Sequence, residues 1–240
     1  MRNILPIQPF TSEARSCVEI PGSKSLTNRA LALAALADGK TRLQGCLFSE
    51  DTEIMGTALA QLGISIERDK DSKAITVTGN AGTWSKDEAE IHVGNAGTAA
   101  RFLTAMLCLH TAGTYQMDGT QAMRNRPMQG LLDTLRQLGA RITCHGQEGH
   151  FPFTLNTSGL PGGTWSVDAT QSSQILSALL MSAPYARDKV ELQLAGDTVS
   201  KPFVRMTLDM MRDFGACVTG DGLTTTRIDP TAQYLSLIHI

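Results

Sequence analysis

The clearest pattern along the chain is an amphipathic helical stretch that ends in Leu-Gly or Phe-Gly and leads directly into alternating polar and apolar residues. It occurs three times, as IMGTALAQLGISI (54–66), GLLDTLRQLGARIT (130–143) and MTLDMMRDFGACVT (206–219). Gly63, Gly139 and Gly215 are 76 residues apart (139 − 63 and 215 − 139). Because glycine readily takes the left-handed conformation that ends a helix, each copy predicts a helix, a glycine cap and a strand.

A second apolar helix is predicted before each copy, and a short strand-like run follows each of these helices. The three helices cover residues 28–36, 98–107 and 172–181. The resulting unit contains strand, helix, strand, helix and strand, and no low-complexity linker divides the units. We therefore predict an α/β (α+β) domain of three βαβαββ-type repeats related by pseudo-threefold symmetry.

Composition narrows the class of protein. The 240 residues are 42% hydrophobic, and the formal net charge of -2 provides no overall field for nucleic acid or an acidic membrane. No segment combines membrane-spanning length with an absence of charges, and two prolines interrupt the first ten residues, where a secretory signal needs a continuous apolar run. We expect a soluble, cytoplasmic protein with neither a nucleic-acid nor a membrane partner.

Five widely spaced cysteines lack metal-ligand spacing, which indicates reduced, structural thiols and no metal site. Cys17 and Cys217 stand in strand-like contexts and Cys108 in an apolar helical run, and such positions are typical of buried thiols.

Candidate chemistry lies in the loops that open the three first helices. These loops are PGSKS (21–25), GNAGT (94–98) and DATQSSQ (168–174), and threefold symmetry would bring them together. A helix amino terminus stabilises an anion through unpaired backbone N–H groups, and Lys24 and Arg29 add full charges. The alternative for the serines and threonines is helix capping alone.

Two further helix entrances carry cations, in MRNRP (123–127) and VSKPF (199–203). Arginine at a helix start opposes the helix dipole unless an anion intervenes. Cations occupy equivalent places in the repeats at Lys24, Arg29, Arg101, Arg126 and Lys201. We interpret them as one composite anion site rather than as unrelated surface charges.

The segments PGSKSLTNRA (21–30) and GNAGTAAR (94–101) resemble the two signatures of 5-enolpyruvylshikimate-3-phosphate synthases. The likeness continues in family order through Arg126-Pro127, Ser172-Ser173-Gln174 and Ser200-Lys201-Pro202, from Ile20 to about Ser236. It implies one of the two domains of the enolpyruvyl transferase fold. It also implies transfer of the enolpyruvyl group from phosphoenolpyruvate to the 5-hydroxyl of shikimate 3-phosphate, with release of phosphate and without a cofactor.

The resemblance also implies the roles of individual residues. Shikimate 3-phosphate would be bound by Lys24, Ser25, Arg29, Ser172, Ser173, Gln174 and Ser200. Phosphoenolpyruvate, whose pocket is also the glyphosate site in this family, would be bound by Lys24, Asn95, Gly97, Thr98, Arg126 and Gln174. Lys24 would have only a positioning role in catalysis. Two positions depart from the family pattern, since Phe102 replaces a common Pro and Phe203 a common Tyr.

The resemblance further predicts a domain division. Residues 1–20 would pack with a C-terminal domain, 21–236 would form the N-terminal domain, and 237–240 would be a non-native tail. The family's main proton-transfer groups belong to the other domain, so we expect this half to bind substrates but to be inactive alone. Its partner would be the missing domain in trans. We expect a monomer, with self-association through the exposed half-enzyme surface as the alternative.

Other interpretations stay open. Asp51, Glu53 and Asp197 are candidates for an acid/base pair, although such residues more often cap helices or face water, and we favour that interpretation. A UDP-N-acetylglucosamine enolpyruvyl transferase would carry Lys-Asn in the first loop and a reactive Cys, whereas this chain has Lys24-Ser25 and no cysteine in a basic loop. A non-catalytic binding or complementation module is the alternative from another class.

Overall fold

The computed structural model describes residues 6–236 except residues 12, 14 and 16, and it orders them into helices and strands along three repeats. The first repeat holds α1 (Lys24–Leu36), β1 (Asp38–Leu43), α2 (Glu50–Gln61), β2 (Ser65–Asp69) and β3 (Ala74–Asn80). The second holds β4 (Glu88–His92), α3 (Gly97–Leu107), β5 (Thr114–Asp118), α4 (Gln121–Arg124), α5 (Gln129–Gln137), β6 (Arg141–Cys144) and β7 (Phe153–Asn156). The third holds β8 (Gly163–Val167), α6 (Ser173–Ser182), the 3₁₀ turn η1 (Ala183–Tyr185), β9 (Val190–Leu194), α7 (Lys201–Asp213), β10 (Cys217–Thr219) and β11 (Thr225–Asp229).

Each repeat forms its own sheet. The orders are β4-β5-β7-β6 and β8-β9-β11-β10 in the second and third repeats, and β1-β3-β2 in the first. The pairs β4–β5 and β8–β9 are parallel, and their strands are connected along the chain by α3 and α6. The other pairs are antiparallel. The predicted βαβαββ unit is thus confirmed in the second and third repeats.

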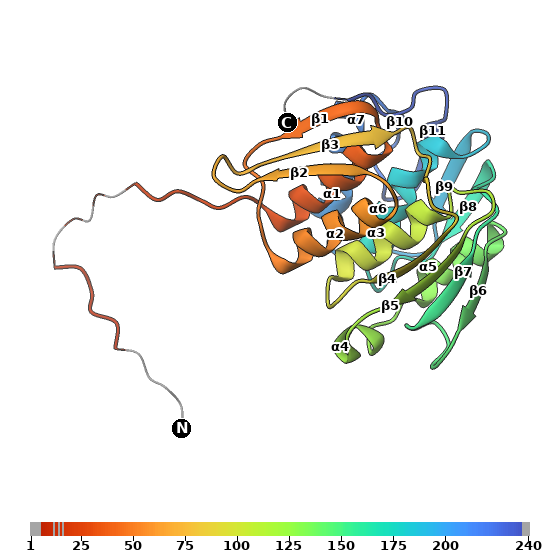
Figure 1. Cartoon of the computed structure of the whole chain (residues 1–240), viewed down its shortest axis with the longest axis horizontal. Helices are drawn as coiled ribbons and strands as arrows, with labels where there is room; N and C mark the ends of the chain where they lie inside the picture. The colour runs from red at the N-terminus through yellow and green to blue at the C-terminus, as the bar shows by residue number, and fades with distance from the viewer. Residues whose placement is uncertain (1–5, 12, 14, 16, 237–240) are drawn as a thin grey trace.

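The first repeat differs, because among the described residues no strand precedes α1. The described part of residues 6–20 instead forms an extended arm that leads away from the body (Figure 1). The strand predicted before the first helix is therefore not found among the described residues.

The three glycine caps are confirmed by their backbone geometry. Gly63, Gly139 and Gly215 have φ values of 96°, 102° and 91°. The next residue in each copy donates its N–H to a carbonyl five residues earlier, in the bonds Ile64 to Leu59 (3.1 Å), Ala140 to Leu135 (3.0 Å) and Ala216 to Met211 (3.0 Å). This is the hydrogen bond that closes a helix on a left-handed residue, and it turns the chain directly into the following strand.

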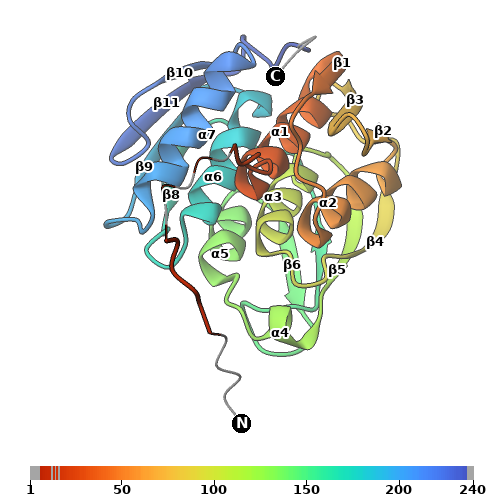
Figure 2. The same ribbon diagram turned by 90° about the vertical axis from the view of Figure 1, so that its left-hand side faces the viewer.

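The core lies between the helices and the inner faces of the sheets. Figure 2 shows the helices gathered between the three sheets, with α1, α3 and α6 near the centre. Every residue of α3 and ten residues of α1 are buried, which explains why their sequences are apolar nearly all round. The sheets alternate instead, as in the buried and half-buried positions of β7, because one face packs on helices and the other faces water. The first helices therefore form the centre of the domain.

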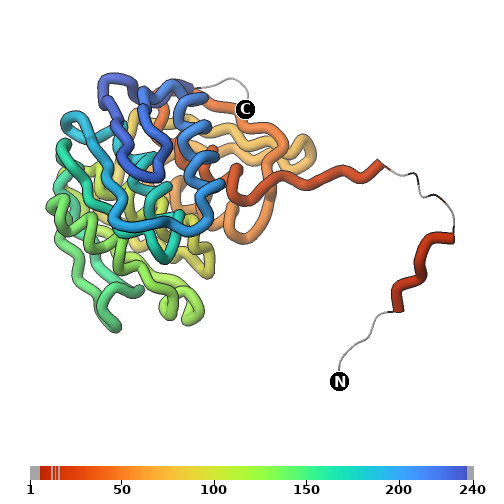
Figure 3. The backbone as a smooth tube through the Cα atoms, turned by 180° about the vertical axis from the view of Figure 1, so that it is seen from behind, coloured from red at the N-terminus to blue at the C-terminus, as the bar shows by residue number. Residues whose placement is uncertain are grey.

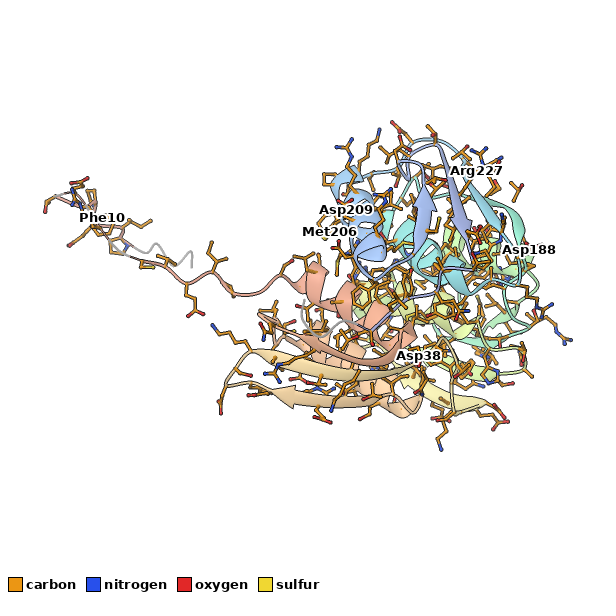
Figure 4. The ribbon with its side chains drawn as sticks, turned by 90° about the horizontal axis from the view of Figure 1, so that it is seen from above. Phe10, Asp38, Asp188, Met206, Asp209 and Arg227 are labelled. Atoms are coloured by element: carbon orange, nitrogen blue, oxygen red, sulfur yellow. The ribbon has the colours of Figure 1, made fainter. Side chains whose placement is uncertain are left out.

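The arm and the end of the described chain lie apart from this core. Ile7 is 90% and Phe10 is 85% exposed, and Figures 3 and 4 show the arm standing clear of the body with Phe10 far out on it. Leu235 forms a parallel bridge with Asp38 at the edge of β1. The division at residues 20 and 236 stays a prediction, and the expected tail at 237–240 lies outside the described residues.

The burial expected for two cysteines was wrong. Cys46 and Cys108 are buried, but Cys17 and Cys217 are exposed. Cys17 lies on the arm, and Cys217 belongs to a strand whose residues alternate exposed, buried, exposed, so that its side chain is on the solvent face. Among the helices that the structure describes, none has the length and apolar character needed to cross a bilayer.

Candidate functional site

The amino termini of four helices meet around one cavity. The cavity has a volume of about 220 Å³ and receives residues from the starts of α1, α3, α6 and α7 and from the loop after α4. Its lining consists of Ser25, Arg29, Thr98, Arg126, Gln171, Ser172, Ser173, Gln174, Val199, Ser200 and Phe203. Repeat symmetry therefore brings together loops that are far apart in the sequence, as the pattern predicted.

Eight of the eleven residues predicted for the site line this cavity. The other three, Lys24, Asn95 and Gly97, lie next to lining residues. The carbonyl of Asn95 accepts a long hydrogen bond of 3.5 Å from Arg126 Nη1, and Gly97 lies beneath the same guanidinium. Lys24 Nζ lies 3.2 Å from Asp51 Oδ2 at the start of α2. The geometry groups all eleven around one place, and their individual roles stay predictions.

Helix capping accounts for only some of the hydroxyl groups. Ser172 accepts the N–H of Gln174 at 3.2 Å and caps α6, so the capping interpretation holds there. Neither α3 nor α7 has a side-chain cap, and Ser200, before α7, has a left-handed backbone with φ 56°. At α3 the first N–H groups consequently remain available to an anion in the cavity. At α7 fewer are available, because Pro202 has no N–H and Phe203 donates its N–H to the Ser200 carbonyl at 3.0 Å.

Gln174 connects the second and third repeats inside the cavity. Its Nε2 donates to Thr98 Oγ1 at 3.1 Å, which joins the start of α6 to the start of α3. Its Oε1 is buried and has no hydrogen-bond partner among the described residues. A buried acceptor of this kind costs about 1–3 kcal/mol, which a ligand hydroxyl could remove by donating to it.

Three guanidinium groups at the site have no carboxylate partner in the part of the chain that the structure describes. They belong to Arg29, Arg101 and Arg126, of which Arg29 and Arg126 line the cavity. Arg101 lies behind it and donates to the carbonyls of Gly97 (3.1 Å) and Pro127 (2.7 Å). Burial lowers the pKa of Arg29 to about 10. Burial first, and the nearby charge of Arg126 second, lower the pKa of Arg101 to about 10. An anion in the cavity would oppose both effects.

The two lysines of the composite site are instead held by carboxylates. Lys24 pairs with Asp51, and Lys201 Nζ lies 2.9 Å from Asp197 Oδ1. The third carboxylate considered for acid/base chemistry, Glu53, pairs with Arg68 and Lys70 of the first repeat at 3.0 Å each. Among the residues that the structure describes, no carboxylate and no histidine lines the cavity, and no group of three potential metal ligands occurs. The charge of the described lining therefore favours an anion, and the carboxylates considered for acid/base chemistry lie outside that lining.

Two further lining residues, Gln171 and Val199, belong to the candidate loops 168–174 and 199–203, but neither was predicted as a site residue. Gln171 directly precedes Ser172, and Val199 directly precedes Ser200. Their position next to a predicted site serine could have identified both as lining residues.

The three sheet-and-helix repeats around helix amino termini define the enolpyruvyl transferase class of proteins. A solved EPSP synthase from Acinetobacter baumannii superposes with a TM-score of 0.78 at 25% identity, over 93% of this chain and 48% of that one. An enolpyruvyl transferase from Streptomyces tendae shares the fold, with a TM-score of 0.64 at 18% identity.

Within that class the chain belongs to the family described as EPSP synthase (3-phosphoshikimate 1-carboxyvinyltransferase), whose profile matches residues 11–240. A 3-phosphoshikimate 1-carboxyvinyltransferase from Opitutus terrae is 47% identical over 225 residues, covering 93% of this chain and 52% of the relative. One from Shewanella amazonensis is 42% identical over 233 residues, covering 97% of this chain and 54% of the relative. The family expected from the motifs is confirmed, and the chain spans about half the length of the curated relatives that it matches.

Proposed function

We propose that this chain forms the substrate-binding face of a 3-phosphoshikimate 1-carboxyvinyltransferase. The whole enzyme would transfer the enolpyruvyl group of phosphoenolpyruvate to the 5-hydroxyl of shikimate 3-phosphate and release phosphate. The observation that carries the proposal is the cavity itself, in which serine hydroxyls and helix amino termini converge with guanidinium groups that have no carboxylate partner among the described residues.

The two substrates would divide the cavity between them. The phosphate of shikimate 3-phosphate fits the hydroxyl-rich side, formed by Ser25, Ser172, Ser173 and Ser200 with Arg29, and the shikimate ring would reach Gln174. Phosphoenolpyruvate fits the opposite side, where Arg126 lies over Gly97 beside Asn95 and Thr98. Lys24 would serve both once its pairing with Asp51 yields to an anion. Neither substrate site requires a cofactor.

Catalysis would depend on a second polypeptide segment. Transfer requires a general acid and base at the reacting atoms, and the described residues of the cavity lining include neither a carboxylate nor a histidine. We therefore propose that the chain binds substrates but is inactive alone, and that its partner is the other half of the enzyme, supplied in trans in the cytoplasm. The exposed arm residues Ile7, Phe10, Val18 and Ile20 offer an apolar contact for that half. Without it, we expect a monomer that self-associates at high concentration.

A non-catalytic binding module is the second candidate, and the same absence of acid/base groups from the lining favours it. Phosphate release separates the two. We expect the pure chain to release no phosphate from the two substrates together, and to do so once a purified polypeptide carrying the other half of the Opitutus terrae relative is added. If the mixture releases no more phosphate than either part alone, the module interpretation prevails.

Calorimetric titration of shikimate 3-phosphate into the chain tests the binding proposal. The test variant is Ser173→Ala with Ser200→Ala, and the control is Ser158→Ala with Ser182→Ala, which removes two hydroxyls outside the cavity lining. We expect saturable binding by the wild type and the control, and a loss of roughly tenfold or more in the test variant, since hydrogen bonds to a charged group contribute about 1.5–3 kcal/mol each. Absence of binding by the folded wild type, or equal losses in both variants, would contradict the proposal.

A further inference from the structure

Arg29 is enclosed by three helices although it belongs to the cavity lining. Arg29 is only 2% exposed and is one of the largest side chains buried in the domain. Nε donates to Thr207 Oγ1 at 2.7 Å and Nη1 to the Ser25 carbonyl at 3.0 Å. Nη2 donates to Ser177 Oγ at 3.2 Å and to the Phe203 carbonyl at 3.3 Å. A guanidinium has five donors, so the described residues leave one N–H, on Nη1, without an acceptor.

Two aromatic rings hold the same guanidinium from other directions. Arg29 Cζ lies 5.4 Å from the ring centroid of Phe102 on α3 and 5.7 Å from that of Phe203 on α7. Cation–π contacts at these distances favour one plane of the group and contribute about 0.5–2 kcal/mol each. Phe102 and Phe203 are also the two positions at which the sequence departs from the common family pattern.

Of the four hydrogen bonds of Arg29, the shortest is the one from Nε to Thr207 Oγ1. Nε joins the guanidinium to the rest of the side chain, so this bond helps to fix the plane of the group. The Thr207 hydroxyl is fully buried and lies within donating distance of the Phe203 carbonyl (2.8 Å) and of Ser177 Oγ (2.9 Å). Because the single hydroxyl proton is directed to one of these acceptors, a lone pair remains for Arg29 Nε–H. Thr207 does not line the cavity, so it can influence an anion there only through residues that do, and of these Arg29 carries the charge.

We propose that Thr207 is a positioning residue for anion binding, which holds the Arg29 guanidinium so that its remaining N–H serves the phosphate-bearing substrate. The inference deepens the proposed function and rests on it. Ser177 and the two rings restrict the same group, but Thr207 is the one side chain that accepts from Nε. Removal of its hydroxyl leaves a buried N–H unsatisfied and lets the guanidinium plane rotate, while the charge of Arg29 is retained.

The test compares Thr207→Val, which keeps the shape and removes the hydroxyl, with Thr207→Ser, which keeps the hydroxyl. Thr104→Val is the matched control, because Thr104 is also fully buried in a helix and its hydroxyl donates to the carbonyl four residues earlier, that of Ala100, at 2.7 Å. Titration of shikimate 3-phosphate into each full-length chain should show affinity roughly tenfold weaker for Thr207→Val, equivalent to about 1.4 kcal/mol. Thr207→Ser and Thr104→Val should bind within about twofold of the wild type.

A second measurement does not depend on the substrate. In a ¹⁵N-labelled chain the Arg29 Nε–H resonance, assigned as the one lost in Arg29→Lys, should be protected from solvent exchange in the wild type, in Thr207→Ser and in Thr104→Val. It should exchange rapidly in Thr207→Val. Three results would overturn the inference: wild-type affinity in Thr207→Val, weak binding by Thr207→Ser, or an unprotected Nε–H in the wild type. The last of these does so even if Thr207→Val does not fold. A wild type that shows the protected Nε–H but does not bind shikimate 3-phosphate refutes the proposed function instead.

Discussion

The guanidinium of Arg126 lies directly over Gly97, the first residue of α3. A Cβ atom added to Gly97 would come within 2.5 Å of both Nη1 and Nη2 of Arg126. Since real Cβ atoms do not approach other atoms so closely, the present place of the Arg126 charge depends on the missing side chain at residue 97. The uncapped start of α3 and the Arg126 cation can thereby act on the same anion.

Gly97→Ala should therefore weaken phosphoenolpyruvate binding with little effect on the fold. Alanine is favoured over glycine in a helix by up to about 1 kcal/mol, and the atoms it meets are the far end of a flexible side chain, so Arg126 swings aside. We expect affinity for phosphoenolpyruvate to fall roughly tenfold, because a charge-assisted contact contributes about 1.5–3 kcal/mol, while shikimate 3-phosphate affinity stays within about twofold.

Calorimetric titration of both ligands checks this, with Gly146→Ala as control, because a Cβ at Gly146 meets nothing within 4 Å. Unchanged phosphoenolpyruvate binding in Gly97→Ala would show that Arg126 does not contact that substrate from its present position.

Local features of the fold were predictable from the sequence. The caps at Gly63, Gly139 and Gly215 follow from neighbouring residues, and the 76-residue spacing then places the three loops together. The contacts of Arg29 were not predictable, because Ser177 and Thr207 are 148 and 178 residues away along the chain. Periodicity indicates which face of a helix is buried, but not which distant side chain meets it.

The absence of a strand before α1 among the described residues was also not predictable from the sequence. The repeat pattern predicts a strand before each first helix, but pairing depends on whether the segment returns to its own sheet. Likewise, the sequence pattern predicted that Lys24 is one of the cations that bind an anion. In the fold, Asp51 of α2 lies 3.2 Å from the Nζ atom of Lys24. Both outcomes are set by tertiary approach rather than by local propensity.

Phe203→Tyr should strengthen binding of shikimate 3-phosphate. The Phe203 ring lines the cavity and is 38% exposed, so an added hydroxyl can reach a ligand without being buried unsatisfied. One hydrogen bond contributes about 0.5–1.5 kcal/mol, which corresponds to an affinity gain of roughly two- to tenfold. Titration beside Phe10→Tyr, which adds the same hydroxyl on the exposed arm, measures the gain. Equal affinities for the two variants would mean that this ring edge does not face the substrate.

Four of the five thiols should react in two classes, with the half-buried Cys144 between them. Cys17 and Cys217 are exposed, so a thiol reagent should modify both rapidly in the folded chain. Cys46 and Cys108 are buried, and burial raises the pKa of each thiol, so both should react only after unfolding. Mass spectrometry of peptides after a short exposure, with and without denaturant, assigns the classes. Fast labelling of Cys108 without denaturant would contradict the burial of α3.

Asp229 should contribute to acid sensitivity of the third repeat. Its carboxylate accepts the hydroxyl (2.7 Å) and N–H (3.0 Å) of Thr231 and lies 3.2 Å from Lys189 Nζ. These contacts, led by the Thr231 hydroxyl, lower the pKa of Asp229 from 3.8 to about 2. A carboxylate with a lowered pKa stabilises the fold above pH 3.8, and that stabilisation is lost as the pH falls toward about 2.

Asp229→Asn should therefore unfold at a lower temperature than the wild type at pH 7, and the two melting temperatures should converge as the pH falls from 3.8 to about 2. Thermal unfolding followed by circular dichroism over this range gives the comparison. Asp188→Asn, on an exposed aspartate in the same repeat, is the control. A difference between Asp229→Asn and wild type that persists undiminished at pH 2 would rule out titration of this carboxylate as the cause.

The ion pair of Lys24 and Asp51 should weaken ligand binding, because it places a carboxylate beside the proposed anion site. Lys24 is the first residue of α1, next to Ser25 of the cavity lining, and an anion must compete with Asp51 for its ammonium. Asp51→Asn removes the competitor and should raise affinity for shikimate 3-phosphate by roughly two- to fivefold, since a partly exposed ion pair contributes about 0.2–1 kcal/mol. Glu53→Gln removes the same charge from the same helix but frees Arg68 and Lys70 instead. If both variants gain affinity equally, general electrostatics rather than release of Lys24 is responsible; a gain confined to Asp51→Asn identifies the Lys24 ammonium as a ligand-binding group.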